Sequence, residues 1–515
     1  MLFAVFLLQA GTITGEVRSP SGPLAGAQVV ARSASSRMTT GTTTDARGRY
    51  ALPLPPGADV RVQVGGQEWT APPRDSVRAG AQVDFTASPV SAASQLHPSA
   101  SWLGLLPDGD TKRKFILDCT GCHQFNESRA LQNGAPRSAS QWAADVSRML
   151  GYAGASSNFP VIAADRNPEE TGMFVYAAVQ RSLARLADPS SRPPALPPSP
   201  ATVTEYDLPV AQDLPHDVAV DSTGQIVITG MFSHRMFVLN PTTGNVTETP
   251  IPVPNANPRA VELDAKGNWW VLLGGPRQVA RYELATKQWK TFPIGMYPHS
   301  VAVAPDGNSV WFNGHFTKKP IQMGRLDART GEVQRFNAPD HPVLSDAGGP
   351  VPYEQRLAPD GTVWMSELIG NRILSLDPRS GKFSTWSLPR TNSGPRRFDI
   401  DRSGVLWIPA YSGNALVRFD PKGGQFTEFT LPVPDAVPYI ARVHPRTGDI
   451  WIGTAAADAV FRFEPGTGKF SRYPVLTRGA TMRHMAIDPR SGDVWIAYGA
   501  SPAIHPSRIA RLSLR

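Results

Sequence analysis

The chain has little cysteine, little charge and no long apolar run. Only two of its 515 residues are cysteines, and only 18% are charged. Two cysteines exclude a disulfide-rich scaffold and a four-cysteine zinc site. No apolar run approaches the roughly 18 residues that span a bilayer, so we expect no transmembrane helix. The net charge of +8 comes from scattered basic residues, which argues against nucleic-acid binding and for attraction to acidic partners.

The abundant residues indicate turns and short strands in several domains. Fifty prolines and 45 glycines are typical of a mainly β chain. A prior of roughly 150 residues per domain predicts three or four domains. Linkers rich in Ser, Ala and Pro at 89–100 and 187–200 divide the chain. The expected segments are 1–10, 11–88, 101–187 and 201–515.

The first ten residues form a short apolar run that suits a secretory signal. The charged segment that normally leads a signal is missing. Two alternatives therefore stay open: the true start lies upstream, or the run is a buried strand. We expect export, and therefore a periplasmic or extracellular location.

Residues 11–88 alternate apolar and polar side chains between glycine-containing turns. The order I-x-G-x-V, P-L-x-G-A-x-V, T-x-x-x-G-x-Y-x-L and L-P-P-G resembles the carboxypeptidase regulatory-like domain. The resemblance implies a seven-stranded β-sandwich with a structural or adhesive role and no catalytic residues.

Both cysteines fall in one motif, Cys119-Thr120-Gly121-Cys122-His123. The CxxCH spacing is the attachment signature of c-type haem: Cys119 and Cys122 form thioethers, and His123 is the proximal iron ligand. A disulfide, a thioredoxin-like pair and half of a zinc site are the alternatives. Zinc needs about four ligands, and a redox pair is expected beside a βαβ unit, which these flanks do not show. Haem c is the expected cofactor.

Three helices are predicted around this motif. The first runs from Thr111 to Asp118, the second follows a Ser138 or Ser140 cap, and the third starts at Asn167-Pro168. A helix before CxxCH, a middle helix and a closing helix resemble the cytochrome c fold over residues 103–186. Met149 is the candidate distal iron ligand or a core residue, whereas Met173, the second candidate, is expected in the core. An exchangeable sixth position stays open.

A repeat of about 43 residues fills residues 201–515. Each copy has a Pro, a strand, Asp-x-x-Gly, a strand with Trp, a third strand, Asp-Pro-x-x-Gly and an outer strand. The repeat predicts a seven-bladed β-propeller. The last copy lacks its outer strand, which Thr202–Pro209 is expected to supply, closing the ring. The recurring tryptophans are expected between blades: Trp311, Trp364, Trp407, Trp451 and Trp495.

Two phrases, at 298–307 and 360–373, resemble the virginiamycin B (streptogramin) lyase family. The resemblance implies a divalent metal such as Mg²⁺, C–O bond elimination, and a Glu before a Pro-His pair. His216 and His299 are the candidate catalytic residues, but Leu214 and Tyr297 stand where the family has Glu. Glu354 and Glu367 are substitutes only if the geometry allows it.

The residue after each repeat proline should face the central channel. These seven positions are all polar or aromatic, with three arginines, so an anionic ligand is the expected guest. They are His216, Arg259, His299, Tyr353, Arg396, Tyr439 and Arg483. The alternative is that they only bind neighbouring blade loops.

The leading hypothesis is an exported c-type cytochrome. Its haem exchanges one electron, and its propeller binds a small anionic substrate or a redox partner protein. Two alternatives remain: a metal-dependent C–O lyase with an accessory haem domain, and a non-enzymatic surface binding module.

Overall fold

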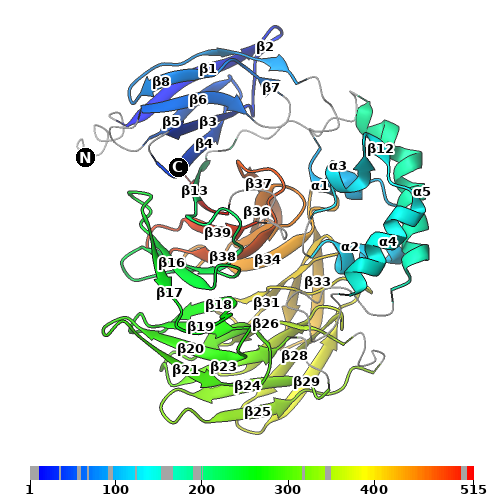
Figure 1. Ribbon diagram of the computed structural model, residues 1–515, viewed down its shortest axis with the longest axis vertical. Helices are drawn as coiled ribbons and strands as arrows, with labels where there is room; N and C mark the ends of the chain where they lie inside the picture. The colour runs from blue at the N-terminus through cyan, green and yellow to red at the C-terminus, as the bar shows by residue number, and fades with distance from the viewer. Residues whose placement is uncertain are drawn as a thin grey trace.

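A computed structural model describes most of the chain, in three parts: a β-sandwich, a helical segment and a propeller-type array of sheets (Figure 1). The described residues are 11–33, 36–54, 59–65, 69–90, 97–121, 124–151, 166–188, 199, 201–315, 319–342, 349–499 and 507–514. The expected signal segment, Cys122 and His123 therefore lie outside them. Within the described residues, no helix is both long and apolar enough to cross a membrane.

The sandwich occupies the region expected for it. Its strands are β1(Thr12–Ser19), β2(Gly22–Pro23), β3(Gln28–Ser33), β4(Met38–Thr43), β5(Arg49–Pro53), β6(Asp59–Gly65), β7(Trp69–Thr70), β8(Arg74–Arg78), β9(Phe85–Thr86) and β10(Ser88–Pro89). In β6 the buried Val60, Val62 and Val64 alternate with exposed residues, which is the period-two pattern read from the sequence. The valines pack with Ile13 and Leu52 in a separate core.

The described residues of the helical segment form five helices: α1(Ser99–Leu103), α2(Asp110–Cys119), α3(Glu127–Ala130), α4(Ala139–Leu150) and α5(Pro168–Ala187). The short strands β11(Leu131–Gln132) and β12(Ala135–Pro136) form a hairpin between α3 and α4. Ser138 caps α4 in a capping box with Gln141, and the Asn167 side chain accepts from the first amides of α5. The three predicted helices are thus confirmed within two residues at their starts.

Among the described residues, the rest forms seven antiparallel units of four strands, the blades; six are separate sheets, and the seventh is part of an eight-stranded sheet. Their strands are, in blade one, β14(Pro215–Val220), β15(Ile226–Gly230), β16(Arg235–Leu239) and β17(Val246–Pro250); in blade two, β18(Pro258–Leu263), β19(Trp269–Leu273), β20(Gln278–Glu283) and β21(Gln288–Pro293); in blade three, β22(Pro298–Val303), β23(Ser309–Gly314), β24(Gln322–Asp327) and β25(Val333–Asn337); in blade four, β26(Pro352–Leu357), β27(Val363–Glu367), β28(Arg372–Asp377) and β29(Lys382–Ser387); in blade five, β30(Asp399–Ile400), β31(Leu406–Ala410), β32(Ala415–Asp420) and β33(Gln425–Thr430); in blade six, β34(Pro438–Val443), β35(Ile450–Thr454), β36(Ala459–Glu464) and β37(Lys469–Pro474); and in blade seven, β38(Met482–Ile487), β39(Val494–Tyr498), β40(Arg508–Leu514) and β13(Ala201–Asp207).

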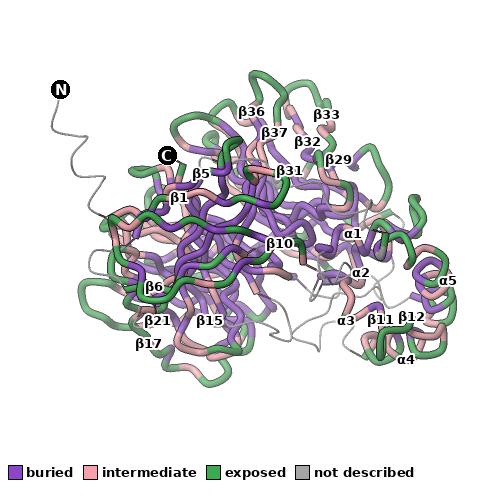
Figure 2. Tube along the Cα trace, turned by 90° about the horizontal axis from the view of Figure 1, so that it is seen from above, coloured by how far each residue is buried: buried purple, intermediate pink, exposed green. Residues whose placement is uncertain are grey.

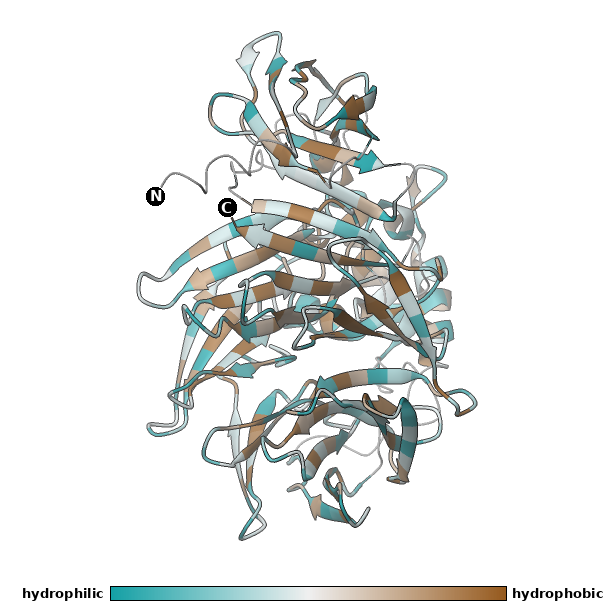
Figure 3. Cartoon of the chain, turned by 90° about the vertical axis from the view of Figure 1, so that its left-hand side faces the viewer, coloured by the Kyte–Doolittle hydropathy of each residue, from teal (hydrophilic) through white to brown (hydrophobic). Residues whose placement is uncertain are grey.

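The ring closes as the sequence predicts. Strand β13 pairs with β40 along its whole length, from Ala201 opposite Leu514 to Asp207 opposite Arg508. The inner strands of blades seven and one, β38 and β14, contact each other. The alternating hydropathy of the blade strands is visible in Figure 3, and the five recurring tryptophans are buried on the second strands. Each second strand packs between blades, so the tryptophans are core residues, as expected.

The sandwich is joined to blade seven by a shared sheet, which the sequence did not predict. Strand β4 pairs with β13, so one sheet runs in the order β38-β39-β40-β13-β4-β3-β6-β8. Side chains add to the junction: Arg32 lies 2.9 Å from the Asp207 carboxylate, and Thr42 donates to the Ala201 carbonyl at 3.1 Å. The outermost strand of blade seven is therefore covered rather than exposed as an edge.

Candidate functional site

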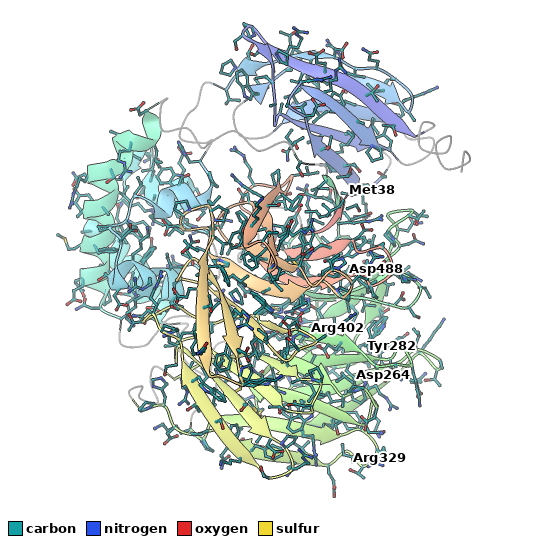
Figure 4. All side chains as sticks on the ribbon, turned by 180° about the vertical axis from the view of Figure 1, so that it is seen from behind. Met38, Asp264, Tyr282, Arg329, Arg402 and Asp488 are labelled. Atoms are coloured by element: carbon teal, nitrogen blue, oxygen red, sulfur yellow. The ribbon has the colours of Figure 1, made fainter. Side chains whose placement is uncertain are left out.

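The helical segment is seated on the face of the propeller where the loops between second and third strands and between blades meet. The Ala100 amide donates to the Ala456 carbonyl at 2.9 Å, and Lys112 pairs with Asp435 at 2.7 Å. Residues of α1, α2 and α5 share one apolar core with blades four to seven. Turns on the other side of the propeller carry Asp264 and Asp488, which Figure 4 shows away from the helices.

The first three residues of the CxxCH motif, Cys119–Gly121, lie at this contact. Cys119 ends α2, and the next residue, Thr120, binds Tyr411 of blade five through two hydrogen bonds: the hydroxyls lie 2.9 Å apart, and the phenol donates to the Thr120 carbonyl at 2.8 Å. The Gly121 carbonyl accepts from Arg483 of blade seven at 3.0 Å. The described part of the motif therefore rests on the predicted channel ring.

The ring residues converge because the inner strands begin with a β-bulge. The register shifts directly after the leading Pro or Met in β14, β18, β22, β26, β34 and β38. A bulge turns a strand and re-aims its side chains, often beside a functional site. All seven predicted ring residues are at most 6% exposed, and Figure 2 shows the propeller interior as buried throughout.

One guanidinium organises the aromatic half of the ring. Arg396 lies over the rings of three tyrosines, 3.8 Å from the centroid of Tyr411, 4.2 Å from Tyr439 and 4.8 Å from Tyr353. The hydroxyls of Tyr353 and Tyr439 are hydrogen-bonded to each other. Such cation–π contacts gain strength when they are desolvated, as they are here.

The histidine half of the ring is neutral. The His216 and His299 rings are 5.5 Å apart, and His315, which the sequence pattern did not single out, stacks on His299 at 4.1 Å. Burial, followed by nearby arginines, holds the pKa of His216 well below its ordinary value, and burial and the other histidines do the same for His299. The buried His299 Nε2 has no hydrogen-bond partner among the described residues.

A network of ion pairs fills the channel beside the ring. Arg397 pairs with Asp217 at 2.9 Å, and Glu354 pairs with Arg442 at 3.1 Å and with Arg356 at 3.0 Å. All five side chains are largely buried. Because its arginines already neutralise it, Glu354 is not poised to act as a base.

Glu367, the second carboxylate considered as a substitute for the family's Glu, is also occupied by an ion pair. Glu367 forms a short, buried pair with Arg372, at 2.5 Å. Among the residues that the structure describes, no group of three or more His, Cys, Asp or Glu is arranged to hold a metal ion.

The electrostatic field at the ring is positive. Burial alone would raise the pKa of Tyr439, but Arg396, Arg483 and Arg397 outweigh it and lower that pKa to about 8. Burial raises the pKa of its partner Tyr353. The arginines around Tyr439 therefore favour negative charge at this place in the ring.

The structure brings the residues of the predicted ring together, except that Arg259 lies apart from the tyrosine group. Arg259 donates to the Tyr297 hydroxyl at 3.0 Å and stands over that ring, outside the tyrosine group. A missed signal exists in the sequence: the second residue after the repeat proline is also ionic in several blades, as Asp217, Glu354 and Arg397 show. Regular strand alternation would turn Asp217 and Glu354 away from the channel, and the bulges in β14 and β26 aim both positions inward.

The two methionines of the helical segment differ in exposure. Met149 is half-buried near the end of α4, but Met173 is 58% exposed on α5. The expectation that Met173 fills the core is wrong: α5 contributes Val175, Ala178, Val179 and Leu186 to the core instead. An iron ligand needs a shielded position, so Met173 is poorly placed.

Sequence comparisons match both ends of the chain. Residues 340–511 match the virginiamycin B lyase family, and residues 12–88 match the carboxypeptidase regulatory-like domain. No protein of curated function matches the chain. The two matches leave residues 89–339 uncovered, including the CxxCH motif.

Structural comparisons concern the propeller. The selenomethionine-substituted virginiamycin B lyase from Staphylococcus aureus has 21% identity and a TM-score of 0.53, covering 61% of this chain and 100% of that one. A catalytically inactive His-to-Ala form of that enzyme with quinupristin has the same identity and coverage and a TM-score of 0.54. A streptogramin B lyase has 19% identity and a TM-score of 0.54, covering 61% of this chain and 98% of that one.

The structural similarity establishes the fold of the propeller, but sequence identities this low leave its chemistry open. The chain thus combines an N-terminal carboxypeptidase regulatory-like domain with a C-terminal virginiamycin B lyase-like domain of the propeller type.

Proposed function

We propose that the chain is an exported c-type haem protein that exchanges single electrons over the mouth of its propeller. Cys119 and Cys122 would hold haem c, and His123 would hold its iron, in the periplasm or outside the cell. The observation that carries the proposal is the contact of Thr120 and Gly121, inside the CxxCH motif, with Tyr411 and Arg483 of the buried ring.

The surroundings of Cys119 fit haem. Its thiol is free, and it packs against a core that includes Phe115 and Phe125. Desolvation raises the pKa of this thiol to about 12. Redox-active thiols have lowered pKa values, so this raised pKa speaks against a thioredoxin-like pair. An apolar wall on one side and arginines on the other suit a macrocycle with an apolar body and two propionate carboxylates.

The residues of this chain would orient the group and exclude water. Helices α1 and α2 shield the motif with buried Trp102 and Leu103 and hold it on the propeller through Lys112 and Asp435. Haem, when bound, supplies one-electron exchange. Half-buried Met149 remains the candidate sixth ligand. A small anion or a redox partner protein would be the source or acceptor of the electron.

The test is covalent haem on the full chain. The chain is co-expressed with a c-type maturation system, run on a haem-stained denaturing gel and measured by its pyridine haemochrome spectrum. We expect staining of the wild type and none of the Cys119→Ser, Cys122→Ser double variant. His123→Ala should retain the stain and lose low-spin character. A wild-type chain without haem under these conditions refutes the proposal.

The comparisons support a second candidate better than the first. They match the propeller to virginiamycin B lyases, and neither family match includes the CxxCH motif. A metal-dependent C–O lyase would use His216 and His299 with Mg²⁺. Leu214 and Tyr297 precede these histidines in place of Glu, and the helical segment covers the ring. Chelator-sensitive ring opening of a streptogramin B, lost in His299→Ala, would establish this candidate, and no turnover would dismiss it.

A further inference from the structure

Asp458 of blade six departs from a pattern that the neighbouring blades follow. The residue directly before the third strand has a positive φ in blades four, five and six, and it is Asn371, Asn414 and Asp458 in turn. Its Oδ1 accepts from the backbone amide of the residue 22 positions further along the chain, in the loop before the next blade. These amides belong to Ser393 at 2.8 Å, Ala436 at 2.9 Å and Ala480 at 3.1 Å. The three blades therefore form the same slot for this side chain.

The two asparagines also use the other half of their amide. Asn371 Nδ2 donates to the Arg390 carbonyl at 2.9 Å, and Asn414 Nδ2 donates to the Val433 carbonyl at 3.1 Å, each 19 positions further along the chain. A carboxylate has no N–H to donate, so Asp458 can supply this donor only as the protonated carboxylic acid.

The helical segment covers the slot of blade six. Ala100 of α1 donates to the Ala456 carbonyl, and the Gln124 amide donates to the carbonyls of Ala455 at 2.7 Å and Ala480 at 3.2 Å. Asp458 is 6% exposed. Burial disfavours its charged form and outweighs the amides and side chains that favour it, so the pKa of Asp458 rises to about 6.

Other charged groups surround this carboxyl. Arg472 of β37 and Arg478 of the following loop face Asp458 and favour its charged form, as the Gln124 amide does from the helical segment. His97, which precedes α1 and faces Arg478, titrates in the opposite sense, because burial lowers its pKa and acid therefore disfavours its buried state. The effect of Asp458 must be measured with His97 unchanged.

We propose that Asp458 is a protonation-dependent latch, which holds the helical segment on blade six when the carboxyl is protonated and loosens this contact when it is charged. The sign follows from linkage. The pKa in the covered state, about 6, lies above the ordinary value of 3.8, so the contribution of Asp458 is fully present below the ordinary value and is lost as pH rises through the higher one. The inference does not depend on haem.

Hydrogen exchange of the full-length chain tests the latch. The Ala100 amide is the reporter, because it donates directly to the propeller. Its opening equilibrium constant is measured in the wild type and in Asp458→Asn, which carries the residue of blades four and five. The ratio of the wild-type constant to that of the variant should rise roughly tenfold between about pH 5 and about pH 7.5. The titration of His97 cancels in this ratio.

A matched control places a carboxylate in the equivalent slot of blade five. Gln124 donates to the loops of blades six and seven, and Asn414 is only half-buried, so Asn414→Asp should alter the pH dependence of the Ala100 opening less than twofold. Circular dichroism establishes that each variant is folded, and the neutral Asp458→Ser replaces Asp458→Asn if the latter does not fold, with the same tenfold change expected.

Two outcomes overturn the latch: a ratio that stays constant with pH, and a ratio that falls as pH rises. A tenfold rise that Asn414→Asp reproduces would also overturn it, because the effect would then not belong to blade six. Haem attachment does not enter the comparison, so a chain that takes no haem refutes the haem function and leaves this test unchanged.

Discussion

Gly394 offers a sharp test of how the helical segment is seated. It lies in the loop before blade five with φ +67°, and a Cβ built there would approach Leu117 Cδ2 of α2 to 2.3 Å. Leu117 is 1% exposed within the shared core, so it has no open space to move into. Gly394→Ala should therefore push α2 off the propeller.

The expected cost has two parts. A non-glycine residue at positive φ costs roughly 1–2 kcal/mol, and overpacking a filled core costs about 1–3 kcal/mol more. Gly404, in the turn before β31, separates them: its φ is +86° and no atom lies within 4 Å of the position that a Cβ would take, so Gly404→Ala should bear only the backbone strain. The difference between the two variants isolates the contact with Leu117.

Hydrogen exchange measures this difference where it arises. We expect the free energy of local opening of α2 to fall by about 1–3 kcal/mol in Gly394→Ala and to stay unchanged in Gly404→Ala. Adding Leu117→Ala to Gly394→Ala should relieve the overlap, with a favourable coupling of about 0.5–3 kcal/mol. Equal protection of α2 in both glycine variants would refute the docking described above.

Three further predictions follow from single contacts. Asp435→Asn should lower the free energy for opening α2 by about 1.5–3 kcal/mol, because buried Lys112 then keeps only the exposed Asp108 as a charged partner. Hydrogen exchange measures this change, and Asp420→Asn on β32, far from α2, should leave the opening of α2 unchanged. Tyr439→Phe should abolish a phenolate absorbance that rises between pH 7 and 9. Since the folded pKa of about 8 lies below the ordinary value of 10.0, the wild type should also gain stability over this variant as pH rises from the first value to the second, and an unchanged titration would contradict the lowered pKa. A chain without residues 1–90 should self-associate through β13, whose edge β4 now covers; sedimentation at several concentrations measures it, and a monomer at all of them would show that β4 is dispensable.

The fold was predictable wherever the sequence repeats. Spacing of about 43 residues indicated the blades, and the missing outer strand indicated the pairing of β13 with β40. The pairing of β4 with β13 was not predictable, because two strands with alternating patterns carry no signal for choosing each other across domains. The exposure of Met173 was missed for a related reason: α5 has apolar residues on more than one face, so its pattern does not select the buried one.

The site was predictable in part, and local backbone geometry explains the remainder. Counting one residue after each proline found Tyr353, Arg396 and Tyr439, which the structure brings together. Tyr411 and His315 follow directly after second strands, a position that the repeat leaves undefined, and they became visible only with the blades assembled. Inward-facing Asp217 needed the bulge in β14, which no sequence pattern announced.

The three parts of the chain act on one another through shared structure, and this bears on function. A propeller with an open mouth could admit a bulky substrate, but here α1, α2 and residues Cys119–Gly121 cover the ring, and Arg396 and Tyr439 are almost fully buried. The sandwich in turn covers the strand that closes the propeller. The buried, positively charged ring lies directly under Cys119–Gly121, so it would reach a large external substrate only if the helical segment moved away from the propeller.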